Sequence, residues 1–202
     1  MNPSFWNERF ASETPTYGTA PNTFVEAQVG RVPEGAAVIE LGAGEGRNAV
    51  FLAERGFNVT ALDYSTEGLR KAAALAETRG VAIEPLQADV TQWQPDRTWD
   101  AVAISFLHLP PDHRPGLHRL IQHILRPGGF LIAEWFRPAQ VIEGYTSGGP
   151  PRAAMMLTQD ELHAAFPEAG IQLLESVETD LDEGPHHQGP AAVVRFVWQK
   201  PG

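Results

Sequence analysis

The sequence predicts an α/β fold in which helices cover both faces of a mostly parallel sheet. From about residue 37 onward, short apolar runs alternate with stretches of helical period. A bend of glycines, GAGEG, joins the first apolar run to the first helical stretch. The last two runs are separated only by TDLDEGPHHQGP, which is too short for a crossover helix. Right-handed crossovers therefore make the early strands parallel neighbours, whereas the last two strands form an antiparallel pair.

The predicted elements follow one another in a regular order. The strands cover Ala37–Leu41, Asn58–Leu62, Ala82–Pro85, Ala101–Phe106, Phe130–Phe136, Gln172–Glu178 and Ala191–Gln199. The helices cover Arg47–Arg55, Thr66–Arg79, Pro111–Leu125 and Thr158–Ala165. The second helix has a Ser/Thr start, Glu67 in its first turn, an alanine-rich body and a stop at Gly80. His113 and His118 are expected on the surface of the third helix.

Length and composition favour one globular domain over residues 1–202. We expect residues 1–30 to form a lid or capping segment and residues 31–202 to form a core, with a substrate flap near 137–157. The formal net charge of −10 and the scattered basic residues argue against a nucleic-acid partner. No window approaches the ~18 apolar residues of a membrane span, and the chain has no cysteine. A cytoplasmic protein, monomeric or weakly dimeric, is the expectation.

The glycine bend follows the first predicted strand in VIELGAGEGRN. Gly42, Gly44 and Gly46 let the backbone turn sharply and let a ligand lie against bare peptide. The helix that follows directs its first N–H groups at that ligand, which favours a carboxylate or a phosphate. A dinucleotide fingerprint requires a glycine where Arg47 stands, so the spacing present is G-x-G-x-G. A nicotinamide site and a purely structural turn stay open at this point.

Two aspartates follow the second and third predicted strands. Asp63 lies about twenty residues after the glycines, where a carboxylate can accept both hydroxyl groups of a ribose. Ser65 or Thr66 can cap the next helix, which leaves Asp63 free for a ligand. Asp89 lies just past the third strand, where it can accept a hydrogen bond from an adenine amino group.

Five motifs in order, VIELGAGEGRN, VTALDYS, LQADV, WDAVAISFLHLP and LRPGGFLIAEWF, resemble those of class I S-adenosylmethionine-dependent methyltransferases. The resemblance covers roughly residues 20–200. It implies a Rossmann-like three-layer sandwich with a seven-stranded sheet and an antiparallel last strand, and S-adenosyl-L-methionine as cofactor. Within this family, FWNERF, YGTAPNTFV and the small size resemble bacterial tellurite-resistance-type methyltransferases, which are related to enzymes that methylate thiols and chalcogens.

The resemblance also implies which residues bind the cofactor. Residues of the glycine bend would contact the methionine moiety, and Arg47 or Asn48 would hold its carboxylate. Asp63 would bind the ribose, and Asp89 would bind the adenine amino group. Phe106 would lie beneath the sulfonium, with core packing as its alternative. The full cofactor-binding set is Gly42, Ala43, Gly44, Arg47, Asn48, Asp63, Tyr64, Ser65, Ala88, Asp89, Val90, Ser105 and Phe106.

The candidate catalytic residues lie in loops and in the N-terminal segment. His108 follows the fourth strand, where a histidine can accept a proton or orient an anionic acceptor; a loop histidine bonded to backbone is the alternative. Tyr17 would close over the site from the N-terminal segment. His187 or its neighbour His186 would contact the acceptor from the last loop. No third ligand stands at a suitable spacing from these two histidines, so no metal site is predicted.

These features together predict in-line transfer of a methyl group to a small-molecule acceptor. A sulfur, selenium or tellurium acceptor ranks above nitrogen or oxygen because no strong constellation of bases is present. The motif NPPY or DPPY, expected for methylation of amino groups on bases or glutamine, is replaced by SFLHLPP. An NAD-dependent oxidoreductase and a non-catalytic S-adenosylmethionine-binding regulatory module are the alternatives.

Overall fold

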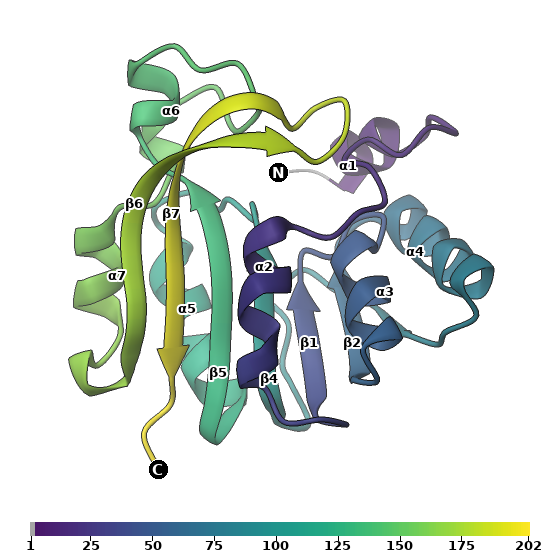
Figure 1. Cartoon of the computed structure of the whole chain (residues 1–202), viewed down its shortest axis with the longest axis horizontal. Helices are drawn as coiled ribbons and strands as arrows, with labels where there is room; N and C mark the ends of the chain where they lie inside the picture. The colour runs from purple at the N-terminus through teal and green to yellow at the C-terminus, as the bar shows by residue number, and fades with distance from the viewer. Residues whose placement is uncertain (1–2) are drawn as a thin grey trace.

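The structure, a computed structural model, describes residues 3–202. Its centre is a seven-stranded sheet of order β3-β2-β1-β4-β5-β7-β6 (Figure 1). The strands are β1 Ala37–Leu41, β2 Asn58–Asp63, β3 Glu84–Gln87, β4 Trp99–Ser105, β5 Leu125–Phe136, β6 Ile171–Asp182 and β7 Gln188–Gln199. Strands β1 to β5 pair in parallel, and β7 is antiparallel to both β5 and β6. The predicted Rossmann-like three-layer sandwich is therefore confirmed.

Helices cover both faces of this sheet (Figure 1). They are α1 Pro3–Arg9, α2 Thr23–Gln28, α3 Arg47–Glu54, α4 Thr66–Arg79, α5 Arg114–Ile124, α6 Ala139–Ile142 and α7 Gln159–Ala165. On one face, α2, α3 and α4 pack on the strands through a core that includes Phe24, Leu52 and Leu69. On the other face, α5 and α7 pack through Ile121 and Leu162. No helix in the described part of the chain is long and apolar enough to cross a membrane.

Several element boundaries differ from the predicted ones for identifiable reasons. Strand β3 begins at Glu84, two residues later than predicted, because its mostly exposed residues give it no clear apolar pattern. Helix α5 begins at Arg114 rather than at Pro111, and Pro115 occupies its first turn, where a missing N–H costs nothing. Strands β4 and β5 begin earlier than predicted because Trp99 and Leu125 pair ahead of a β-bulge.

The last hairpin is longer than predicted. Strand β6 continues past Glu178 to Asp182, and β7 begins at Gln188 rather than at Ala191. The sequence does not indicate this extension, because the outer positions of the added strand residues are polar. The extra length carries the hairpin tip over the edge of the sheet and close to the N-terminal segment (Figure 1).

The N-terminal segment is fastened to the core at two points. Asn7 Oδ1 accepts a hydrogen bond of 2.6 Å from Ser65 Oγ, which ties α1 to the start of α4. Asn22 is fully buried, and its Nδ2 donates to Glu134 Oε1 at 2.7 Å and to Glu183 Oε1 at 3.0 Å. This segment therefore covers one edge of the sheet instead of extending into solvent.

Candidate active site

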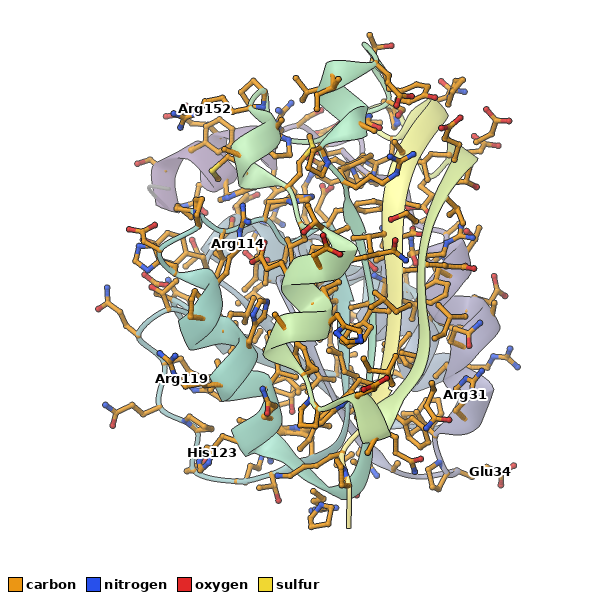
Figure 2. All side chains as sticks on the ribbon, turned by 90° about the vertical axis from the view of Figure 1, so that its left-hand side faces the viewer. Arg31, Glu34, Arg114, Arg119, His123 and Arg152 are labelled. Carbon is orange, nitrogen blue, oxygen red and sulfur yellow. The ribbon has the colours of Figure 1, made fainter. Side chains whose placement is uncertain are left out.

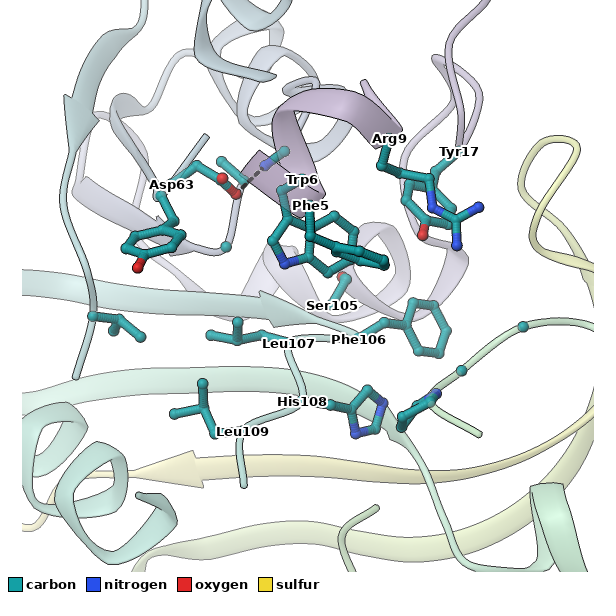
Figure 3. A pocket seen from close by; sticks show the side chains of 18 of the residues that line it. Phe5, Trp6, Arg9, Tyr17, Asp63, Ser105, Phe106, Leu107, His108 and Leu109 are labelled. Carbon is teal, nitrogen blue, oxygen red and sulfur yellow. Dashed lines mark hydrogen bonds between the residues drawn. The ribbon is translucent and has the colours of Figure 1, made fainter. Parts of the chain in front are cut away.

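A cavity of about 620 Å³ lies beyond the carboxyl ends of β1, β2 and β4 and beneath α1 (Figure 3). Ligands of open α/β sheets bind at this edge, where the strand order reverses between β1 and β4. All predicted site residues except Ser65 line this cavity. They are Tyr17, Gly42, Ala43, Gly44, Arg47, Asn48, Asp63, Tyr64, Ala88, Asp89, Val90, Ser105, Phe106, His108 and His187.

Ser65 does not line the cavity and, besides its bond to Asn7, has two structural roles. Its side chain is completely buried, and its Oγ accepts a 3.0 Å hydrogen bond from the Gly68 N–H, which caps α4. Its own N–H donates to Asp63 Oδ1 at 2.7 Å. Ser65 therefore acts behind the cavity wall and positions the aspartate in front of it.

The glycine bend and Asp63 are built as one unit. Gly42, Gly44 and Gly46 have φ angles of 78°, 54° and 84°, in the left-handed region that favours glycine. A Cβ added to Gly46 would lie 2.5 Å from the Cβ of Ala72, so a glycine is needed where α3 meets α4. Gly44 N–H donates to Asp63 Oδ2 at 2.7 Å. Burial raises the pKa of Asp63, and backbone N–H bonds to its carboxylate oppose that rise.

Besides His187 Nδ1, two buried atoms on the cavity wall have no hydrogen-bond partner among the described residues: Glu40 Oε2 and Arg47 Nη1. The other atoms of these groups are held. Glu40 Oε1 accepts from Asn48 Nδ2 at 2.7 Å, and Arg47 Nη2 donates to Glu183 Oε2 at 2.6 Å. Burial raises the pKa of Glu40 to about 8. One free acidic oxygen and one free guanidinium nitrogen on the same wall fit the ammonium and carboxylate groups of a bound methionine moiety.

Asn48 has no side-chain atom that lacks a hydrogen-bond partner. Its Oδ1 accepts from the Asn22 N–H at 2.7 Å, and its Nδ2 donates to both Glu40 Oε1 and Ser105 Oγ. Of the two residues expected to hold the methionine carboxylate, only Arg47 therefore keeps an unused donor among the groups described. Asn48 instead orients Glu40.

The adenine end of the cavity is simpler. Asp89 Oδ1 accepts from the N–H and the hydroxyl of Thr91 at 2.9 Å and 2.7 Å, which fixes the direction of its carboxylate. Tyr64 and the backbone around Asp89 line the same end. This arrangement suits a flat ring with an exocyclic amino group.

Helix α1 covers the middle of the cavity. Figure 3 shows Phe5 and Trp6 between Asp63 on one side and Phe106 on the other. The Trp6 ring stacks on Phe10, with centroids 5.5 Å apart, and Phe10 itself is buried. Phe10 therefore docks the helix, whereas Trp6 faces the cavity.

Four rings, those of Tyr17, Phe106, Phe136 and His187, form an aromatic wall at the far end of the cavity from Asp63. Phe106 has a φ of 57°, which is unusual for a bulky residue. This conformation puts its ring 4.5 Å from both Phe136 and His187, measured between centroids. The Tyr17 ring also lies 4.5 Å from His187. The Phe106 side chain therefore belongs to this wall rather than to the main core.

His108 lines the cavity, but both of its ring nitrogens are engaged by the backbone. Nδ1 lies 3.2 Å from the carbonyl oxygen of Met155, and Nε2 accepts from the Phe136 N–H at 3.4 Å. Burial lowers its pKa to about 3. The ring is therefore neutral and has no free nitrogen for a substrate proton, which argues against the expected role as a base. Its contacts instead tie the flap to the end of β5.

His187 is differently surrounded. Its Nδ1 lies 3.9 Å from Glu183 Oε2, beyond hydrogen-bond distance, and has no hydrogen-bond partner among the described residues. Burial lowers the pKa of His187, and Arg47 lowers it further, whereas Glu183 opposes the shift. Burial alone would raise the pKa of Glu183, but His187 and Arg47 more than offset that effect and lower it. The result is a neutral imidazole backed by a charged carboxylate.

Sequence reasoning missed two residues that shape this site, Glu183 and Asn22. Both lie in segments that drew attention for other reasons, and each acquires its role only through contacts with distant parts of the chain. His118 also differs from the expected surface position: it is buried, with its ring 5.4 Å from that of Phe166. Among residues 3–202, no three His, Asp or Glu side chains cluster as metal ligands.

Comparisons with known proteins agree with this architecture. Residues 38–129 match a family model described as a methyltransferase domain. A trans-aconitate 2-methyltransferase from Azoarcus sp. (strain BH72) is 38% identical over 110 residues, which cover 52% of this chain and 41% of that protein. A ubiquinone biosynthesis O-methyltransferase from Rickettsia canadensis (strain McKiel) is 25% identical over 150 residues, covering 68% of this chain and 63% of that protein. The chain thus spans less than two thirds of the length of these curated relatives.

Solved structures share the fold over nearly the whole chain. TehB from Haemophilus influenzae has a TM-score of 0.75 at 15% identity and covers 98% of this chain and 66% of that chain. The N-methyltransferase NodS from Bradyrhizobium japonicum WM9, solved with S-adenosyl-L-homocysteine, has a TM-score of 0.70 at 14% identity and covers 98% of both chains. With the glycine bend, Asp63 and Asp89 on one cavity at the sheet edge, these matches identify residues 38–129 as a methyltransferase domain of the class I, S-adenosylmethionine-dependent type.

Proposed function

We propose that the protein transfers a methyl group from S-adenosylmethionine to a sulfur, selenium or tellurium atom of a small molecule. The observation that carries this proposal is that, apart from the neutral imidazole of His187, the described residues of the aromatic wall offer no base. His108 has both ring nitrogens engaged, and no carboxylate among the described residues belongs to the wall. A thiolate or chalcogen anion needs little help from a base, whereas an amine or an alcohol needs a strong one.

When bound, S-adenosylmethionine supplies the methyl group on a sulfonium that is already a good leaving group. The residues that would hold it are those at the carboxyl ends of β1 and β2. Glu40 and Arg47 would bind the ammonium and carboxylate of its methionine moiety through their free atoms. Asp63 would bind the ribose, and Asp89 would bind the adenine amino group.

The acceptor would enter between α1 and the aromatic wall. Burial raises the pKa of Tyr17, with Arg9 opposing the shift, so its hydroxyl stays protonated and can donate a hydrogen bond to the acceptor. A tautomer with its proton on Nδ1, on the side of Glu183, would leave the Nε2 lone pair of His187 to take the proton of a thiol. Alignment of the two bound reactants can lower the barrier by about 7–11 kcal/mol in favourable cases, and the aromatic rings keep water away.

The named relatives argue for testing oxygen acceptors as well. The curated relatives described above are named for methylation of a ubiquinone precursor and of trans-aconitate. Neither is a sulfur compound. A neutral His187 backed by Glu183 is the group that would serve an oxygen acceptor on this wall.

The deciding experiment follows labelled methyl groups from S-adenosylmethionine to a panel of thiols, selenite, tellurite, phenols and carboxylates. We expect thiols or chalcogen anions to be labelled with the highest kcat/KM. Labelling of phenols or carboxylates alone would overturn the acceptor assignment. A parallel thermal-shift measurement with S-adenosylhomocysteine and NAD separates this family from an oxidoreductase, because only the true ligand stabilises the fold.

A further inference from the structure

The charges around the cavity are divided between its two ends. The end near the glycine bend carries the carboxylates of Glu45, Asp63 and Asp89, together with Glu40, which holds its proton near neutrality. The acceptor end, which consists of the aromatic wall and the loops beside it, carries none among the described residues. It carries instead Arg9 from α1 and Arg152 from the loop after α6, in a chain that has 25 acidic and 15 basic residues.

Neither of these arginines is engaged with a carboxylate of the described chain. The Arg9 guanidinium carbon lies 5.8 Å from the centroid of the Phe5 ring, and the side chain lies beside Tyr17 (Figure 3). Arg152 follows the turn at residues 148–151 and lies at the same end of the molecule as α1 (Figure 2). Both side chains are exposed and open to a ligand, whereas the buried Arg114 is paired with Glu161 at 2.8 Å.

The other charges close to the acceptor end are already neutralised. Glu45 accepts from Lys71 Nζ at 2.7 Å and from the Thr16 N–H. Glu183 lies behind the wall and pairs with Arg47. The positive charges of Arg9 and Arg152 therefore face the cavity without a compensating charge from the protein.

Between the cofactor end and these arginines the surface is apolar. Phe5 and Trp6 cover it from above, and Phe106 and Phe136 stack beneath with centroids 4.5 Å apart. A bare inorganic ion would leave most of this apolar surface without a partner. A molecule with a flat or aliphatic body would fill it.

We propose that the methyl acceptor is a small organic anion whose apolar body lies on the aromatic wall and whose carboxylate or similar oxyanion binds Arg9 and Arg152. This proposal depends on the proposed function in one respect: the methyl acceptor must occupy the acceptor end of the cavity. Guanidinium groups suit the task because they bind oxyanions through paired, charge-assisted hydrogen bonds. One arginine comes from the lid and the other from the flap, so the anion would also draw these two segments together.

The test measures binding rather than turnover, so it does not depend on which atom is methylated. Calorimetry on the protein saturated with S-adenosylhomocysteine compares benzoate, benzamide and benzylamine, which share a ring and differ in charge. Acetate and selenite serve as anions without an apolar body. We expect benzoate to bind at least about tenfold more tightly than benzamide, acetate and selenite, and benzylamine to bind most weakly. Equal binding of benzoate and benzamide would overturn the anion site; equal binding of benzoate, acetate and selenite would overturn the apolar body.

Two variants then test whether Arg9 and Arg152 bind the anion. Arg152→Gln and Arg9→Gln should each weaken benzoate binding about tenfold and leave benzamide binding unchanged. Arg119→Gln, an exposed arginine of α5 outside the cavity, is the matched control and should change neither (Figure 2). Unchanged benzoate affinity in both cavity variants would reject the assignment.

Failure of this inference and failure of the proposed function look different. Labelled thiols without a preference for benzoate would remove the anion site and keep the methyl-transfer chemistry. Tight benzoate binding with methylation of oxygen alone would keep the anion site and remove the sulfur, selenium or tellurium assignment.

Discussion

Burial gives single side chains at this site properties that their residue type alone does not predict. Glu40 is an acid that holds its proton near neutrality, and His108 is a histidine that stays neutral in acid, because each lies where water cannot stabilise its charged form. An ammonium group bound against Glu40 would restore the charge of its carboxylate. Ligand binding at this wall should therefore release a proton.

Asp63→Asn tests whether the Asp63 side chain binds the ribose of the cofactor. The amide keeps the shape of the side chain but loses the charge that would accept two hydroxyl groups, so we expect affinity for S-adenosylhomocysteine to fall about 10- to 100-fold. Isothermal calorimetry measures the change. The control is Asp96→Asn, which alters an exposed loop aspartate outside the cavity. Unaltered affinity in the Asp63 variant would contradict the assignment.

His187→Gln tests the proton acceptor. We expect kcat with a thiol of high pKa to fall about 100-fold, and kcat with a thiol that is already ionised to change little. His186→Gln, the neighbouring substitution, should leave both rates near those of the parent protein. A uniform loss with both thiols would show that His187 shapes the pocket and does not take the proton.

Helix α1 and the β6–β7 hairpin complete the cavity from opposite ends of the chain. Helix α1 is short, and few helices shorter than about 12 residues are stable alone, so its order depends on contacts with the core. Asn7 supplies one of them by accepting hydrogen bonds from Ser65 Oγ and from the Glu67 N–H at 3.3 Å. Phe10 supplies another by packing over Gly44.

Asn7→Ala should loosen this lid without unfolding the protein. Loss of the amide oxygen removes hydrogen bonds worth about 1 kcal/mol each, so we expect faster hydrogen exchange in residues 3–9 and a several-fold faster release of S-adenosylhomocysteine. Stopped-flow release and mass-spectrometric exchange measure the two effects. Glu8→Ala changes the adjacent exposed residue of the same helix and should leave both rates unchanged.

At the scale of the whole molecule, the sequence predicted what is local and missed what is assembled from distant segments. The glycine bend and Asp63 lie within one β–α–β unit, β1–α3–β2, and their spacing alone predicted their position on the cavity. Glu183 reaches Arg47 only because the β6–β7 hairpin extends beyond the apolar residues from which its strands were predicted. His108 matched a catalytic position in the sequence, but its backbone partners, residues 136 and 155, lie far along the chain and engage both of its nitrogens.

Buried histidines should make the folded protein sensitive to acid. Burial lowers the pKa of His118 to about 4, whereas an unfolded chain binds this proton near 6.5. The contribution of the neutral His118 ring to the free energy of unfolding is present above pH 6.5. It is lost as the pH falls toward 4, because only the unfolded chain takes up the proton between these two pH values. Glu40 acts in the opposite direction: its pKa of about 8 favours the folded state at low pH, and this contribution is lost as the pH rises through 8.

His118→Gln should therefore flatten the acid side of the stability profile. We expect the loss in free energy of unfolding between pH 7 and pH 5 to shrink by about 1 kcal/mol, measured by urea denaturation. His123→Gln, on an exposed position of the same helix, should leave that difference unchanged (Figure 2). An identical pH difference in the His118 variant and the parent would show that this ring titrates normally in the folded state.

The buried amide of Asn22 restricts how this enzyme can be re-engineered. It neutralises no charge, yet it bridges two acids, one in the fifth strand and one in the terminal hairpin. A chimera that receives a foreign leading segment with an aliphatic residue at position 22 would take the amide donor away from one oxygen of each acid in a dry interior, where unpaired polar groups are costly. A graft that changes the acceptor preference must therefore keep Asn22, or replace Asn22 and both acids at the same time.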